Sequence, residues 1–191
     1  ETLEAQEDAV RSGLAISRGR PLVVGPITLR HRKPFYGPPR SVEGLPFSVD
    51  VRQMSRLLAA WTLGSVKACA EAGAASLTYF ETTGPRGLLV PENREPCPCL
   101  PAHPGMVFPV YQVFKELGAR KGARIVECAS TDPLEVVGFG LVQGGSLTLL
   151  VANLTVRHQR VWLPDLGRDA AIQPVTGGAE LSADTGRPGV S

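Results

Sequence analysis

The pattern of apolar and polar residues changes its period near the middle of the chain. Residues 2–17 place Leu3, Val10 and Leu14 on one face, with acidic residues early, which predicts an amphipathic helix. From Ala123 onward the apolar positions follow a strand-like pattern instead. The expected order is therefore helix, strand, helix, strand, helix, and then a run of strands.

Two helix-strand units dominate the first half. Residues 20–30 are expected to form a buried strand, and residues 76–81 a second one. Between them, Asp50 is expected to cap a long helix, with Gln53 completing a capping box. The apolar face of this helix repeats at helical spacing, at Met54, Leu57, Leu58, Trp61, Ser65 and Ala68.

The second half begins with a short helix whose first turn holds Pro109. Short strands are expected after it, with a tight hairpin at Gly144 and Gly145. Their ranges are 124–129, 136–142, 147–153, 156–163 and 171–175. This run predicts an all-β module of sandwich type.

Two βα units cannot close a barrel or cover both faces of a sheet. The pattern therefore predicts an α/β plus all-β fold, in which the last two βα units of a glycosidase-like TIM barrel precede a C-terminal β-sandwich. The expected domains are residues 1–122 and 123–191. On this interpretation the chain is the C-terminal part of a longer enzyme, whose oligomeric state the pattern does not address.

Charge and motifs narrow the classes of partner. The formal net charge is only +2 in 191 residues, which argues against a nucleic-acid partner or an anionic membrane surface. No apolar run reaches the roughly 20 residues that span a bilayer, and the acidic first residues do not resemble a signal peptide, so a cytoplasmic location is expected. No phosphate loop or nucleophile elbow is present, so no cofactor is predicted. A metal site is not predicted either, because neither the histidines nor the cysteines have the spacing of metal ligands. The four cysteines are expected to be reduced; they are Cys69, Cys97, Cys99 and Cys128.

The polar end of the second strand is the main candidate site. Glu81 is followed there by Thr82 and Thr83, and strand ends of this kind carry the chemistry in αβ barrels. Hydrolysis of an ester or lactone needs a base for water and donors for the oxyanion. Glu81 is the candidate catalytic base and Arg30 the candidate donor. Thr82 and Thr83 are candidate ligands for sugar hydroxyls, or alternatively turn formers before a glycine.

Strand alternation extends this site. Tyr79 lies on the same face as Glu81, and Thr28 on the same face as Arg30, so both are candidate substrate-binding residues at a shared barrel mouth. The structural alternative is a salt bridge from Glu81 to Arg30 or Arg86 that only closes the top of the barrel.

Several motifs together resemble the D-apionate lactonase family. The segments that carry the resemblance are 26–30, 51–55, 60–65, 71–76 and 79–84. The resemblance extends over about residues 1–163 and implies a TIM-like barrel with a C-terminal β domain, and hydrolysis of D-apionolactone to D-apionate in apiose breakdown. It also implies that the usual glycosidase nucleophile position falls at Thr28–Arg32, where no Asp or Glu stands.

The expected function is therefore a lactonase whose ligand is a small sugar lactone. A non-catalytic fragment with a carbohydrate-binding or structural β module is the alternative. A glycoside hydrolase with acids on other strands is a second alternative. Residues 123–191 contain only two aromatic residues, Phe139 and Trp162, which favours a packing role for the β module.

Overall fold

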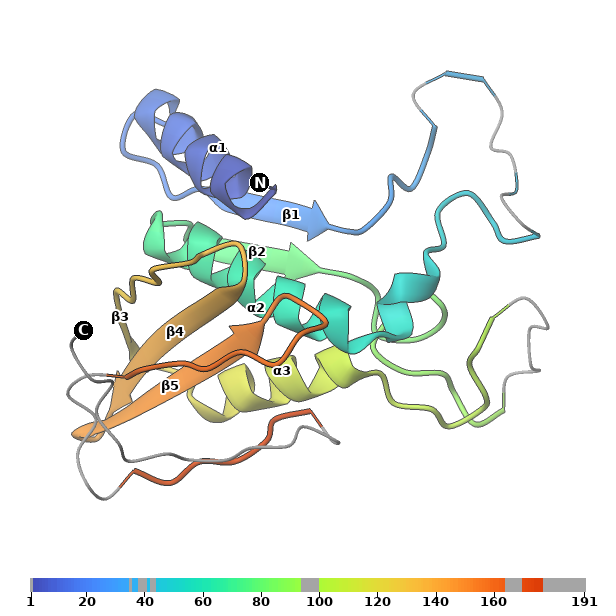
Figure 1. Ribbon diagram of the computed structural model, residues 1–191. Coiled ribbons are helices and arrows are strands. Elements are labelled where there is room, and N and C mark those ends of the chain that lie inside the picture. The colour runs from blue at the N-terminus through green and yellow to red at the C-terminus, as the bar shows by residue number, and fades with distance from the viewer. Residues whose placement is uncertain are drawn as a thin grey trace.

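The fold combines a helical layer with two small sheets (Figure 1). A computed structural model describes residues 2–34, 36–37, 41, 44–93, 100–163 and 170–176. The helices are α1 (Thr2–Ile16), α2 (Arg56–Glu71) and α3 (Pro109–Ala119), with a 3-10 turn η1 (Val51–Met54). The strands are β1 (Val23–Ile27), β2 (Ser76–Tyr79), β3 (Arg124–Val126), β4 (Val136–Gln143) and β5 (Ser146–Asn153).

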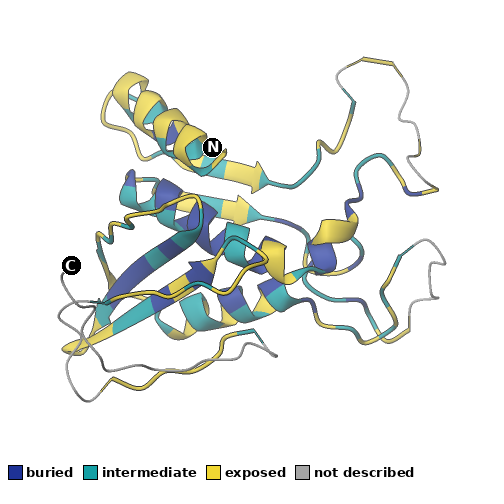
Figure 2. Cartoon of the chain, in the orientation of Figure 1, coloured by how far each residue is buried: buried dark blue, intermediate teal, exposed yellow. Residues whose placement is uncertain are grey.

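Helix α2 lies at the centre and contacts both neighbouring helices as well as β4 and β5. One part of its surface, with Cys69 and Ala72, packs toward the parallel β1–β2 sheet and α1. Another part, with Leu58 and Leu63, packs against α3 and the β-sheet. Buried residues accordingly concentrate on α2, β4 and β5, whereas α1 is largely exposed (Figure 2).

The prediction of an amphipathic first helix is confirmed. Val10 is buried on the face of α1 that meets α2, and Leu14 packs beside it. The helices approach closely because Gly64 has no side chain: a Cβ there would lie 2.6 Å from Leu3 Cδ1. Alanine at this position would therefore require the Leu3 side chain to move.

The two parallel strands are confirmed in type but are shorter than expected. β1 pairs with β2 from Val23 opposite Ser76 to Ile27 opposite Tyr79. The expectation that residues 20–30 form a buried strand is wrong, because Val23 is exposed, and Leu22, Val24 and Ile27, which pack toward the helices, are only partly buried. In the described part of the chain only one face of this sheet is covered, and these residues form no closed barrel.

The expected capping box is also wrong. Asp50 caps only the 3-10 turn, accepting a hydrogen bond from the Arg52 amide at 2.9 Å, and the side-chain amide of Gln53 donates to the Gly87 carbonyl at 2.8 Å. Helix α2 starts afterwards, capped by Ser55. A buried tertiary acceptor thus replaces the local partner that Gln53 would have in a capping box.

The C-terminal module is a three-stranded antiparallel sheet in the order β3-β4-β5. Its hairpin is confirmed, with positive φ at both Gly144 and Gly145. The strands expected at 156–163 and 171–175 are absent, and no second sheet of a sandwich is seen among the described residues. After β5 the side-chain amide of Asn153 donates to the Arg157 carbonyl at 2.7 Å, where the chain bends.

The main hydrophobic core joins the two predicted domains. Leu58 of α2 and Phe108 before α3 belong to the same cluster as Phe139 of β4 and Leu150 of β5. The division at residue 122 stays a prediction, but the packing across it is continuous.

Candidate active site

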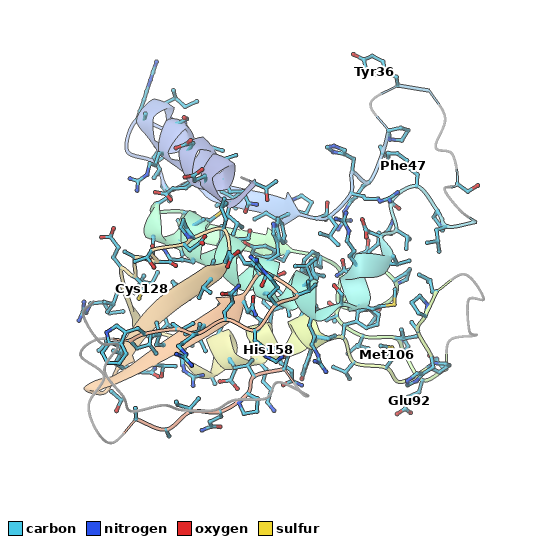
Figure 3. The ribbon with its side chains drawn as sticks, viewed as in Figure 1. Tyr36, Phe47, Glu92, Met106, Cys128 and His158 are labelled. Carbon is cyan, nitrogen blue, oxygen red and sulfur yellow. The ribbon has the colours of Figure 1, made fainter. Side chains whose placement is uncertain are left out.

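The candidate site lies beyond the C-terminal ends of β1 and β2. Both strands point to the same end of the molecule, and the loops that follow them also lie there (Figure 1). The first loop carries Tyr36 and Phe47, and the second carries Glu92 and Met106 (Figure 3). Contacts such as Arg32 to Glu81 and Arg86 to Ser48 join residues far apart in the chain at this end, as in α/β barrels.

Glu81 is held there between two arginines. Its Oε1 atom lies 2.8 Å from Arg86 Nη2 and 3.4 Å from Arg32 Nη1. The Arg86 guanidinium also donates to Ser48 Oγ at 2.6 Å, which fixes it from the opposite loop. The closest contact of both ion pairs is made to Oε1. The side chain is 29% exposed, so water can reach it.

A tight turn after β2 brings Arg86 back over Glu81. The Glu81 amide donates to the Arg86 carbonyl at 3.1 Å, and the Gly87 amide donates to the Gly84 carbonyl at 2.9 Å. Gly84 has φ of 90°, and a Cβ at Gly87 would lie 2.7 Å from the Thr83 carbonyl carbon. The glycines therefore permit a turn that other residues would open.

Asp50 forms a second carboxylate-arginine cluster. Its Oδ2 accepts hydrogen bonds from Arg52 at 2.8 Å and from Arg30 at 3.2 Å, and its side chain is only 5% exposed. Hydrogen bonds from Arg52, and then from Arg30, hold the pKa of this carboxyl well below its usual range, although burial acts to raise it. Asp50 is thus a poor proton acceptor and serves to position two guanidinium groups.

Of the two salt-bridge partners that the structural alternative named for Glu81, Arg30 does not form the pair. Arg30 turns to Asp50, while Arg32 and Arg86 pair with Glu81. The alternative partner named from the sequence, Arg86, is confirmed. Arg32 was missed, because the segment after β1 does not continue the strand alternation on which side-chain directions were predicted.

The expectation that Tyr79 faces the barrel mouth is wrong. Its hydroxyl lies 2.8 Å from Ser65 Oγ on α2, and its ring packs 5.7 Å from the ring of Phe114. Burial raises the pKa of this phenol. The strand ends at Tyr79 because Phe80 has φ of 45°, so Glu81 no longer shares the face of Tyr79.

The three threonines have mainly local contacts. Thr28 Oγ1 donates to the Arg30 carbonyl at 2.8 Å and so shapes the bend after β1. Thr82 and Thr83 are exposed in the turn, and the Thr82 carbonyl accepts from the Leu88 amide at 3.1 Å. These contacts fit turn formers, and the exposed hydroxyls leave the substrate-binding role a prediction.

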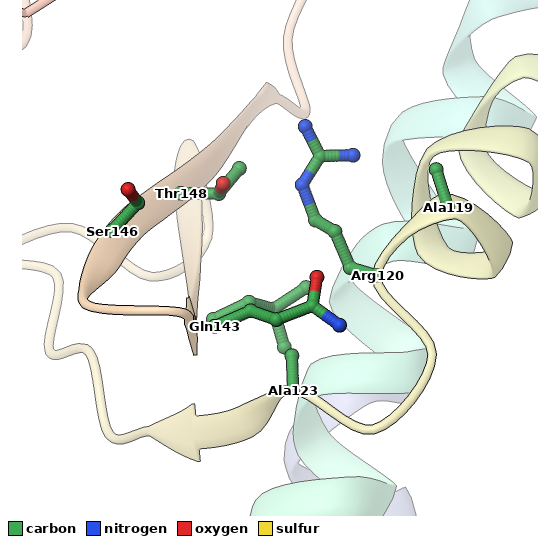
Figure 4. Close-up of a pocket in the computed structure, with 7 residues that line it drawn as sticks. Ala119, Arg120, Ala123, Gln143, Ser146 and Thr148 are labelled. Atoms are coloured by element: carbon green, nitrogen blue, oxygen red, sulfur yellow. The ribbon is translucent and has the colours of Figure 1, made fainter.

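A separate cavity of about 290 Å³ lies between the end of α3 and the β4–β5 hairpin (Figure 4). Arg120 and Gln143 line it, together with small side chains of both elements. Arg120 is already bound to Glu116 at 2.6 Å. This cavity shares no residue with the strand-end site.

Two further properties concern the described residues as a whole. They contain no group of three or more His, Cys, Asp or Glu residues placed to hold a metal ion. They also include no helix that is both long and apolar enough to span a membrane.

The Asp50 cluster gives a stability prediction. Asp50→Asn keeps a good N-cap but removes the charge between Arg30 and Arg52, so we expect the free energy of unfolding to fall by about 1–3 kcal/mol. Because the folded-state pKa is lowered, the carboxylate contributes fully above about pH 4 and its contribution is lost as the pH falls further.

Urea unfolding at several pH values measures both effects. The control is Glu7→Gln, which breaks an exposed pair with Arg11 and should cost less than about 1 kcal/mol. Equal losses for the two variants, or parallel pH curves for wild type and Asp50→Asn, would contradict the assignment.

The described residues form parallel βα units with a carboxylate-arginine cluster beyond the C-terminal ends of the strands, the place where proteins of the α/β class carry their sites. A family model described as D-apionate lactonase, TIM barrel domain, matches residues 1–122. This is more than half of the chain, which therefore belongs to the D-apionate lactonase family. Comparisons with curated proteins and with solved structures gave no match.

Proposed function

We propose that the chain contributes to a lactonase that hydrolyses D-apionolactone to D-apionate, with Glu81 as the base. The family match supports the reaction class. The observation that carries the site is the position of Glu81, at the C-terminal end of a parallel strand and fixed by Arg32 and Arg86. The ligand on this proposal is a small sugar lactone and the location is the cytoplasm.

The proposed step is attack of water on the lactone carbonyl. The Glu81 carboxylate takes a proton from water while the water oxygen bonds to the carbonyl carbon. The carbonyl oxygen becomes an oxyanion, for which the guanidinium groups of Arg30 and Arg32 are the proposed hydrogen-bond donors. The ring C–O bond then breaks and the proton held by Glu81 passes to the ring oxygen, which restores the base. The new carboxylic acid releases its own proton to solvent, so the hydroxy acid leaves as its carboxylate.

The proposed substrate contacts are chosen by which side chains near Glu81 are exposed. Thr82 and Thr83 present hydroxyls beside Glu81 and are the proposed partners of sugar hydroxyls, and Thr28 lies at the end of the neighbouring strand. Tyr79 is not included, because its hydroxyl is already bound to Ser65 beneath the sheet.

The test is a pH-stat assay of the full-length protein on D-apionolactone. Acid release above the spontaneous rate is the expected result. Absence of acid release from folded protein would overturn the proposed function.

Tyr79→Phe tests the structural role of this residue. Removing the hydroxyl eliminates its hydrogen bond to Ser65, so we expect the free energy of unfolding to fall by about 1 kcal/mol. KM for the lactone should not change, because the hydroxyl points away from the strand ends. Thermal melts and initial rates measure the two quantities, and a raised KM with unchanged stability would return Tyr79 to the substrate site.

The aromatic residues of the β module favour a structural role for it over the carbohydrate-binding alternative. Phe139, one of its two aromatic residues, is buried in the shared core and offers no sugar platform. Trp162 is half exposed but stands alone in the described part of the module.

A further inference from the structure

The strand-end site carries an excess of positive charge. Among the described ion pairs there, Arg30, Arg32, Arg52 and Arg86 share two carboxylates, Asp50 and Glu81. The whole chain has a net charge of only +2, so a surplus of this size is concentrated in one place. Each carboxylate is shared by two arginines, and neither neutralises both of its partners.

The four arginines differ in how many of their donors are used. Arg52 makes a two-point contact with Asp50, and Arg86 uses one nitrogen for Glu81 and another for Ser48. Arg30 and Arg32 each form their described ion pair through one nitrogen only. A guanidinium has five N–H donors, so these two keep the most capacity for a further acceptor.

Exposure favours Arg32 as the residue that meets a ligand. Its side chain is 45% exposed, compared with 37% for Arg30 and Arg86. Arg52 is more exposed, at 60%, but its two-point contact with Asp50 already occupies its guanidinium group. Its ion pair to Glu81 is also the longest of the four, at 3.4 Å, and is therefore the one most easily exchanged for another anion.

The arginines limit the chemical class of ligand that this site would bind. Two parallel N–H donors along one edge of a guanidinium group match the planar, two-oxygen geometry of a carboxylate. The lactone substrate is neutral, whereas the hydroxy-acid product carries a carboxylate. The excess of positive charge therefore favours binding of the product over binding of the substrate.

We propose that the arginine-rich end of β1 and β2 is a carboxylate-binding subsite, with Arg32 as its main contact, that retains the sugar-acid product and makes it a competitive inhibitor. This inference rests on the proposed function for the identity of the product, and on the charge and geometry of the site for the binding itself.

The test compares two ligands that differ only in the carboxylate. Erythronate is a four-carbon sugar acid, and erythritol has the same chain with an alcohol in its place. Calorimetric titration of the full-length protein should detect erythronate but not erythritol. Raising the salt concentration from 0.05 to 0.5 M should weaken binding severalfold, on the order expected for partly exposed charges.

Substitutions test whether Arg32 is the main contact of the bound carboxylate. Arg32→Gln should weaken erythronate binding about tenfold or more, and Arg32→Lys should recover only part of it because the planar fork is lost. Arg11→Gln, an exposed arginine on α1 with one carboxylate partner, is the matched control and should bind like wild type. Thermal melts verify that each variant is folded.

The outcomes separate this inference from the proposed function. Lactone hydrolysis with equal affinity for erythronate and erythritol overturns the subsite and leaves the function standing. Erythronate binding that depends on Arg32, without lactone hydrolysis, supports the subsite and overturns the function. Equal binding of inorganic phosphate and erythronate, or no effect of Arg32→Gln, also overturns the subsite.

Discussion

Glu81→Gln is expected to lower the rate of lactone hydrolysis by about 10²–10⁴-fold, the usual contribution of a general base. The glutamine side chain has nearly the same shape, and its amide oxygen can still accept a hydrogen bond from Arg86. It cannot take a proton from water at neutral pH. The loss should therefore appear in kcat, with little change in the melting temperature.

The matched control is Glu116→Gln on α3. Glu116 pairs with a single described arginine, Arg120, at 2.6 Å, whereas Glu81 pairs with two; its side chain is 32% exposed, close to the 29% of Glu81. Initial rates on D-apionolactone, measured beside circular dichroism melts, compare the two variants. If both retain the wild-type rate, Glu81 is a structural partner of Arg32 and Arg86, and the base lies elsewhere.

Phe139→Ala is expected to have the largest effect on stability. The side chain is 2% exposed, on β4 directly opposite Leu150 of β5, and it belongs to the core that includes Leu58 and Phe108. Truncating a buried phenylalanine costs about 3–5 kcal/mol from lost burial and the cavity left behind. This is a large part of the roughly 5–15 kcal/mol that stabilises a typical domain.

The same variant tests the predicted division of the chain at residue 122. Because the core crosses this boundary, helix α2 and the β-sheet should unfold in one transition. In a Trp162→Phe background, the fluorescence of Trp61 reports on α2 and can be compared with the overall melt. Loss of the sheet while α2 remains folded would show that the two parts are independent.

Leu147→Ala is the control in the same hairpin. Leu147 is 53% exposed on β5, so its truncation should change the free energy of unfolding by no more than about 0.5 kcal/mol. A loss as large as that of Phe139→Ala would mean that the outer face of the hairpin is also covered.

Local sequence was enough for several elements. The apolar stripe of Leu3, Val10 and Leu14 determined α1, and the two glycines at 144 and 145 determined the hairpin. Family-specific motifs between residues 26 and 84 were enough to indicate the D-apionate lactonase family, which the family match confirms. In each case neighbouring residues supply the needed information, through periodicity, turn geometry or motif.

Strand formation near the C-terminus shows the limit of this information. Residues 156–163 have suitable composition, yet no strand forms there. A strand needs a partner edge, and the chain bends after β5, where the side-chain amide of Asn153 donates to the Arg157 carbonyl. Local propensity does not specify such a partner.

The candidate site shows the same division between local and tertiary information. The sequence by itself determined that Glu81 stands at the end of a strand after a helix, and it named Arg86 as a possible partner. Only the tertiary structure decided that Arg32 also pairs with Glu81, that Arg30 turns to Asp50, and that Tyr79 lies beneath the sheet against Ser65. Side-chain direction beyond a strand end depends on single backbone angles, such as the positive φ of Phe80, and on which loop folds back. Those choices are made by contacts between residues far apart in the chain.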